Sequence, residues 1–86
     1  MIEFEIYAEG LREGDRIMQL DSQLGTLNGL RYQIDRNHDM VYFEMEEPTT
    51  TLNQVYDGFR RAGLTPKFVG QMPSEFEVGN KTQKIT

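Results

Sequence analysis

Four side chains in two polar segments are the best candidates in this chain for binding a metal ion. Glu13 and Asp15 lie in a loop near the N-terminus, and His38 and Asp39 lie in a later polar turn. Carboxylate oxygens suit hard divalent cations, and an imidazole adds a ligand for borderline cations. The four residues define one candidate site for a divalent cation or a small ligand, provided that the fold brings both segments together.

The same residues also have an ordinary structural interpretation, which the sequence favours. Asp15 is placed to cap a helix, Glu13 can pair with Arg12 or Arg16, and His38 can sit exposed in a turn. We therefore expect no resident metal and no cofactor.

Catalysis has little support in the residue types present. The chain contains no cysteine, which removes thiolate nucleophiles, disulfides and sulfur ligands for soft metals. No serine or second histidine stands in a motif that would pair His38 with a nucleophile. The prediction is a protein that is not an enzyme.

Length and charge limit the remaining classes. The 86 residues correspond to one domain, and the formal net charge of −5 disfavours contact with phosphate backbones. No apolar run reaches the roughly 18 residues of a membrane span, and the first residues do not have the pattern of a secretory signal. We expect a cytoplasmic protein that binds neither nucleic acid nor membrane.

Hydrophobic spacing predicts strand, helix, strand, strand, helix, strand. Period-two alternation favours strands over residues 2–8, 30–35 and 41–45, with a hairpin turn at 36–39, and a short strand over 67–69. A helix that begins near Asp15 should extend to Leu27 with Gly25 inside it, and Gly29 should end the segment. A second helix should follow a capping box and end at Gly63.

This order predicts an α+β, ferredoxin-like βαββαβ sandwich over residues 1–70, with a four-stranded antiparallel sheet and two helices on one face. Residues 71–86 should be a polar tail, with a short added strand near 76–78 as an option. The predicted core consists of Phe4, Ile6, Ile17, Leu20, Leu24, Leu27, Tyr32, Ile34, Val41, Phe43, Leu52, Val55, Phe59 and Phe68.

The chain resembles the heavy-metal-associated (HMA) domain family, which includes small copper chaperones. The matching positions are Gly10-Leu11, Leu20-Asp21, Leu24, Leu27, Gly29-Leu30, Ile34-Asp35, Val41, Phe43 and Ala62-Gly63-Leu64. The family carries a Gly-Met-x-Cys-x-x-Cys motif in its first loop, but here Glu13 and Arg16 occupy the two cysteine positions. A carboxylate beside a guanidinium offers no soft donor, so the metal-carrying activity implied by the resemblance is not expected in this chain.

The sheet face away from the helices is the second candidate surface. Alternation places these residues on it: Glu3, Glu5, Tyr7, Arg31, Gln33, Tyr42 and Glu44. Tyr7 and Tyr42 are expected side by side, and tyrosine with arginine is typical of binding hot spots. An ordinary solvated face is the simpler alternative, since tyrosine also favours strands.

The predicted function is a metal-independent HMA-like interaction or regulatory module. Its interaction surface is formed by Tyr7, Arg31, Tyr42 and Glu44, and its partner is another protein or a second copy in a homodimer. The alternative is the cation or small-ligand binder at the loop end.

Overall fold

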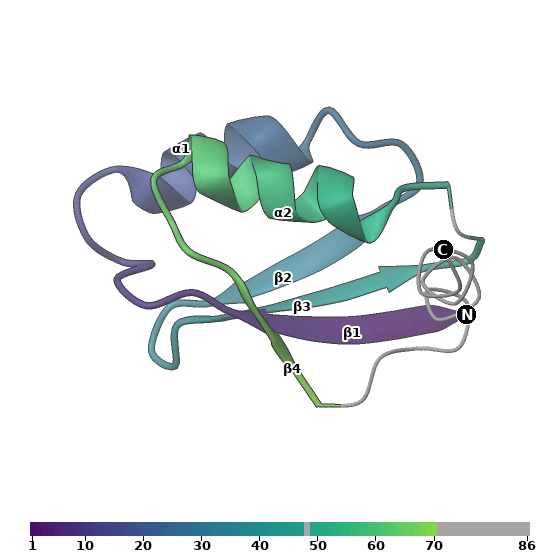
Figure 1. The fold of residues 1–86 in the computed structure, drawn as a ribbon, viewed down its shortest axis with the longest axis horizontal. Helices are drawn as coiled ribbons and strands as arrows, with labels where there is room; N and C mark the ends of the chain where they lie inside the picture. Colours follow the sequence, from purple (N-terminus) through teal and green to yellow (C-terminus); the bar gives the residue numbers. More distant parts are fainter. Residues whose placement is uncertain (48, 71–86) are drawn as a thin grey trace, which may run out of the picture.

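The computed structural model describes residues 1–47 and 49–70, and their fold confirms the predicted ferredoxin-like arrangement (Figure 1). The elements are β1 (Ile2–Tyr7), α1 (Arg16–Leu24), β2 (Arg31–Asp35), β3 (Met40–Met45), α2 (Leu52–Arg61) and β4 (Lys67–Val69). The strands form one antiparallel sheet in the order β2-β3-β1-β4. The predicted polar tail 71–86 and its optional strand near 76–78 lie outside the described residues.

Both helices cover the same face of the sheet, and no described element covers the other face (Figure 1). The two helices contact each other closely at Gly58 of α2. A Cβ added at this position would lie 3.4 Å from Leu24 Cδ2 of α1. Among the described residues, the sheet is thus covered by the helices on its apolar side and uncovered on its outer side. We call this outer side the open face.

The core lies between the sheet and the helices. Of the predicted core residues, the structure buries Phe4, Ile6, Leu20, Leu24, Val41, Phe43, Val55 and Phe59. The others, Ile17, Leu27, Tyr32, Ile34, Leu52 and Phe68, are partly buried and pack against this cluster. Tyr32 stays near the surface because its hydroxyl donates a hydrogen bond to the Asp21 carboxylate, and burial together with this bond raises the pKa of Tyr32 to about 12.

The buried hydrophobic residues that the predicted core omits are Ile2, Ala8, Leu11, Met45, Ala62 and Leu64. Leu11 is the least expected of these, because it is fully buried although it belongs to a polar loop. It anchors the β1–α1 loop to the core.

The prediction that the first helix extends to Leu27 was wrong. Helix α1 ends at Leu24, and Gly25 is its C-cap residue rather than an interior residue. The Gly25 amide still bonds four residues back, to the Asp21 carbonyl at 2.9 Å. The Leu27 amide bonds only three residues back, to the Leu24 carbonyl at 3.0 Å. The chain therefore tightens into a turn that still returns Leu27 to the core, which is why its spacing imitated a helix.

The two helix N-termini differ in how they are capped. At α2 the predicted capping box is confirmed, since Thr51 Oγ1 accepts from the Gln54 amide at 3.2 Å and Gln54 Oε1 accepts from the Thr51 amide at 2.8 Å. At α1 Asp15 occupies the N-cap position but makes no capping hydrogen bond; its carboxylate accepts instead from Gln19 Nε2 at 3.2 Å. The expected side-chain cap at Asp15 was wrong.

Gly29 is expected to be the least replaceable of the turn glycines. Its φ is +74°, and an added Cβ would lie 2.7 Å from Thr49 Oγ1, which itself donates to the Asn28 carbonyl at 2.9 Å. Gly29→Ala should lower the free energy of unfolding by roughly 2–3 kcal/mol, from left-handed strain and loss of that hydrogen bond. Gly14→Ala is the matched control, because Gly14 has a φ of +57° and open space around it. For this control, urea denaturation should show a loss of about 1–2 kcal/mol in the free energy of unfolding. Equal losses in the two variants would contradict the contact between position 29 and Thr49.

Candidate functional site

The first loop and the 36–39 turn meet at one end of the sheet, as the topology predicted. The Ala8 amide donates to the Asp39 carbonyl at 2.8 Å, and the Gly10 amide donates to Asp39 Oδ2 at 3.4 Å. Asp39 has a φ of +53°, a left-handed conformation that aspartate tolerates better than most residues. Asp39 is therefore the connection between the two segments.

The structure does not gather the four predicted ligands. His38 Nδ1 lies 2.9 Å from Asp35 Oδ2, and the His38 side chain is 74% exposed. In the part of the chain that the structure describes, no three histidine, aspartate or glutamate side chains form a group that could hold a metal ion. Asp39 Oδ1 is buried and has no hydrogen-bond partner among the described residues, and Glu13 and Asp15 do not join it in such a group.

Apolar side chains and one guanidinium fill the loop end instead. Leu11 and Leu64 are buried there. A Cβ at Gly10 would lie 3.1 Å from Arg16 Nη1, and one at Gly63 would lie 4.0 Å from Arg16 Nε. Arg16 thus lies against both glycine backbones. The predicted ion pair between Glu13 and Arg12 or Arg16 is not found among the described residues.

The strand register defines how the open face is laid out. Arg31 and Glu3 flank Glu44 in one row across the sheet, while Gln33 and Glu5 flank Tyr42 in the next. A third row follows, in which Tyr7 pairs with Met40. The expectation that Tyr7 and Tyr42 lie side by side was wrong, because Tyr42 is directly opposite Glu5 and Tyr7 is one row further along.

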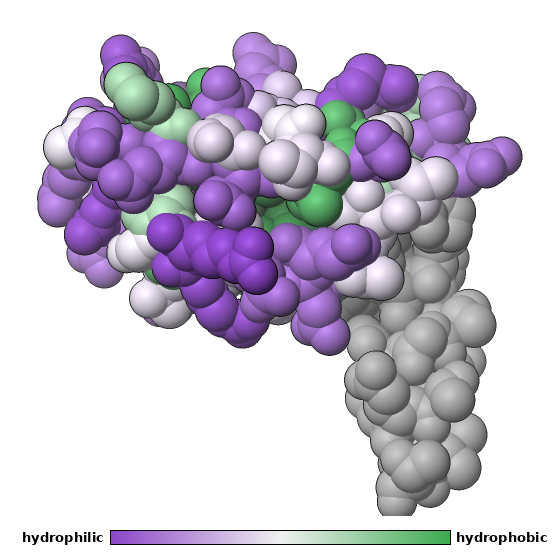
Figure 2. Space-filling model, turned by 90° about the horizontal axis from the view of Figure 1, so that it is seen from above, coloured by the Kyte–Doolittle hydropathy of each residue, from purple (hydrophilic) through white to green (hydrophobic). Residues whose placement is uncertain are grey.

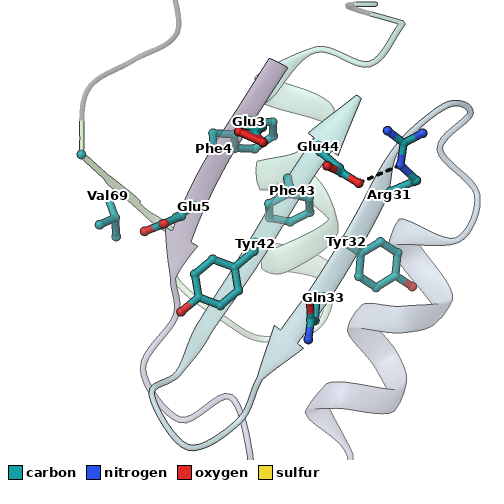
Figure 3. A pocket seen from close by; sticks show the side chains of 11 residues that line it. Glu3, Phe4, Glu5, Arg31, Tyr32, Gln33, Tyr42, Phe43, Glu44 and Val69 are labelled. Carbon is teal, nitrogen blue, oxygen red and sulfur yellow. Dashed lines mark hydrogen bonds and ion pairs between the residues drawn. The ribbon is translucent and has the colours of Figure 1, made fainter. Parts of the chain in front are cut away.

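A hollow of about 540 Å³ lies on the open face (Figure 3). The outward residues that line it are Glu3, Glu5, Arg31, Gln33, Tyr42, Glu44 and Val69. The predicted surface residues Arg31, Tyr42 and Glu44 are therefore in it, whereas Tyr7 is not. Val69 and Gly70 were missed, although alternation from the inward Phe68 would have placed Val69 on this face.

Exposed apolar groups gather in this hollow. The large apolar side chains exposed on the described surface are Met1, Met18, Tyr42 and Val69, and the last two both line the hollow. The helix side of the molecule is mostly hydrophilic, with small separate apolar patches (Figure 2). The open face therefore combines concave shape with exposed apolar area.

Arg31 holds a defined position at the edge of the hollow. Its Nε lies 2.9 Å from Glu44 Oε1 (Figure 3). Its Nη2 lies 3.4 Å from Glu46 Oε1. The hydrogen bond with Glu44 is the main cause that raises the pKa of Arg31. Ion pairs between exposed side chains stabilise a fold little. The consequence here is orientation, because the contacts with Glu44 and Glu46 place the guanidinium at the edge of the hollow.

Tyr42 lies at the centre of the second row and is 38% exposed. Partial burial raises the pKa of its phenol, and the charges of Asp35 and Glu5 raise it further. The neutral hydroxyl is the form favoured in this setting, so Tyr42 can act as a hydrogen-bond donor on an otherwise apolar ring.

Comparison with known proteins supports the fold alone. No family model and no curated protein matches the chain. Among solved structures, the N-terminal domain of PacS from Synechocystis PCC6803 is similar, with a TM-score of 0.62 and 14% sequence identity over 81% of this chain and 100% of that domain. This likeness supports the HMA-like fold that the residues predicted. Across the described residues, no helix is both long and apolar enough to cross a membrane.

Glu5→Gln is expected to lower the pKa of Tyr42, because it removes a negative charge that disfavours the phenolate. The pKa can be followed by the 13Cζ chemical shift of Tyr42 during a pH titration, with Tyr42→Phe to assign the signal. Glu3→Gln is the matched control, since Glu3 lies in the neighbouring row opposite Glu44. An unchanged Tyr42 pKa in Glu5→Gln, or an equal fall in Glu3→Gln, would contradict this register.

Proposed function

We propose that this chain is a small, non-catalytic interaction module of HMA-like fold that acts without a metal and binds a protein partner through the open face. The observation that carries the proposal is the hollow on the uncovered side of the sheet, where Tyr42 and Val69 are exposed together. The helices already bury the other side, so the open face is the side of the sheet available to a partner.

The composition of the hollow supports protein binding. Tyrosine and arginine are enriched at the energetically important positions of interfaces, since each offers large contact area together with hydrogen bonds. The hydrogen bond between Arg31 and Glu44 holds the guanidinium in place before a partner arrives. Groups that are already ordered lose less conformational entropy on binding.

Metal independence is supported by the residues at the loop end. Glu13 and Arg16 stand where the resembled family has cysteines, and Arg16 lies against the backbones of Gly10 and Gly63. The cation-binding alternative would need Glu13, Asp15, His38 and Asp39 to converge, and no observed geometry favours it over the open face.

Partner binding can be located by site-specific photo-crosslinking of the full chain in extracts of its source organism. A photo-reactive amino acid at position 33, inside the hollow, should yield a defined crosslinked protein, and Tyr42→Ala should reduce that product severalfold by removing the central contact. The matched control is the same group at position 18, since Met18 is exposed on α1. A product obtained only from position 18, or equally from both positions, would show that the open face is not the binding surface.

Metal titration tests the second part of the proposal. We expect that Zn(II), Ni(II), Mg(II) and Ca(II) do not shift the amide signals of residues 10–16 and 36–39 together in 15N NMR spectra. Weak Zn(II) binding at the pair of His38 and Asp35 would be local and would disappear in His38→Ala. Saturable shifts that occur jointly in both segments would contradict metal independence.

A further inference from the structure

Resting on the proposed function, we infer that the open face binds a protein segment that presents lysine or arginine side chains, and not a second copy of this chain. The observation behind this inference is an excess of negative charge on the open face that the described residues do not neutralise. It concerns the carboxylates of β1 in particular.

The outward side chains of the four strands carry more acids than bases. The carboxylates are Glu3, Glu5, Asp35 and Glu44, and the cations are Arg31 and Lys67. Arg31 is already engaged by Glu44 and Glu46, and Asp35 contacts His38. Among the described residues, Glu3 and Glu5 form no ion pair.

The register concentrates this charge at the hollow. Glu3 is directly opposite Glu44 on the neighbouring strand, and Glu5 follows two residues later on the same side of β1. Like charges placed opposite each other across strands are unfavourable. An ammonium or guanidinium group from a partner would relieve this repulsion, and the neighbouring Tyr42 and Val69 would supply apolar contact.

A second copy fits the open face poorly. Each copy would bring two carboxylates, Glu3 and Glu5, and one cation, Lys67, that form no ion pair among the described residues. Arg31 stays engaged by its own glutamates. Two chains with a formal net charge of −5 each also repel at longer range. The charge balance therefore favours a partner of opposite sign.

Strand geometry sets the spacing that such a partner needs. Residues on one side of a strand repeat every second position, about 6.6–6.8 Å apart. Glu3 and Glu5 have this separation in sequence on β1. An extended segment with basic residues at alternate positions would match both carboxylates, and the aliphatic stems of those basic side chains would lie on the exposed ring of Tyr42.

The test uses two labelled synthetic peptides with the full chain. One alternates lysine with valine, and the other has glutamate in place of each lysine. Fluorescence polarisation should detect binding of the lysine peptide alone, with affinity that falls as salt rises, and 15N NMR should place the shifts on β1 and β3. The double variant Glu3→Gln/Glu5→Gln should weaken binding roughly three- to tenfold.

The matched control is Glu9→Gln/Glu13→Gln, which changes the net charge equally at exposed positions outside the hollow. Equal weakening by both double variants, equal binding of both peptides, or no binding of the lysine peptide would overturn the basic partner. A dimer in analytical ultracentrifugation that Tyr42→Ala abolishes would also overturn it, in favour of a second copy. These results leave the proposed function standing if position 33 still crosslinks a partner; absence of that product removes the proposed function itself.

Discussion

The antiparallel pairing of β1 with β3 is the interaction on which both sides of this sheet depend. It places Phe4 opposite Phe43, whose rings stack 4.8 Å apart in the core, and it places Glu5 opposite Tyr42 on the open face. Because side chains alternate along a strand, a slip of one residue would exchange the two sets. The energy gained by burying the aromatic stack therefore also fixes the arrangement of the hollow, although none of the hollow's charged groups contributes to that burial.

Much of the fold could be predicted because the strands alternate cleanly between apolar and polar residues. The end of α1 could not, since Leu27 keeps a helical spacing while it lies in a turn that packs on the core. Spacing reports which side chains reach the core, but not which backbone conformation brings them there. Gly25, a residue that disfavours the helix interior, was the local signal for the true helix end. The burial of Leu11 was missed for a different reason: a single apolar residue in a polar loop forms no periodic pattern that would indicate burial.

For the candidate site, alternation predicted the members of the open face but not their neighbours. Whether Tyr42 faces Tyr7 or Glu5 depends on the register between β1 and β3, two strands that are far apart in sequence. The pattern within either strand does not contain this register. The shape of the hollow depends on which long and short side chains are neighbours across strands. The residue pattern of a single strand does not contain this information. At the loop end, the predicted topology correctly placed Asp39 next to the first loop. Whether the four side chains converge on one ion depends on the directions in which they point, and the topology does not determine these directions.

Polar groups at the loop end and on the open face differ in how they are engaged. At the loop end, Asp39 accepts hydrogen bonds from the backbone amides of Ala8 and Gly10 and so connects the first loop to the turn, while His38 contacts Asp35 at the surface. On the open face, one oriented guanidinium borders acids that have no ion-pair partner among the described residues. Binding energy comes from groups that are ordered yet still accessible to solvent, because their interactions are completed only by a partner. Under the proposed function, recognition uses the open face of the sheet, because Arg16 and Leu11 occupy the first loop.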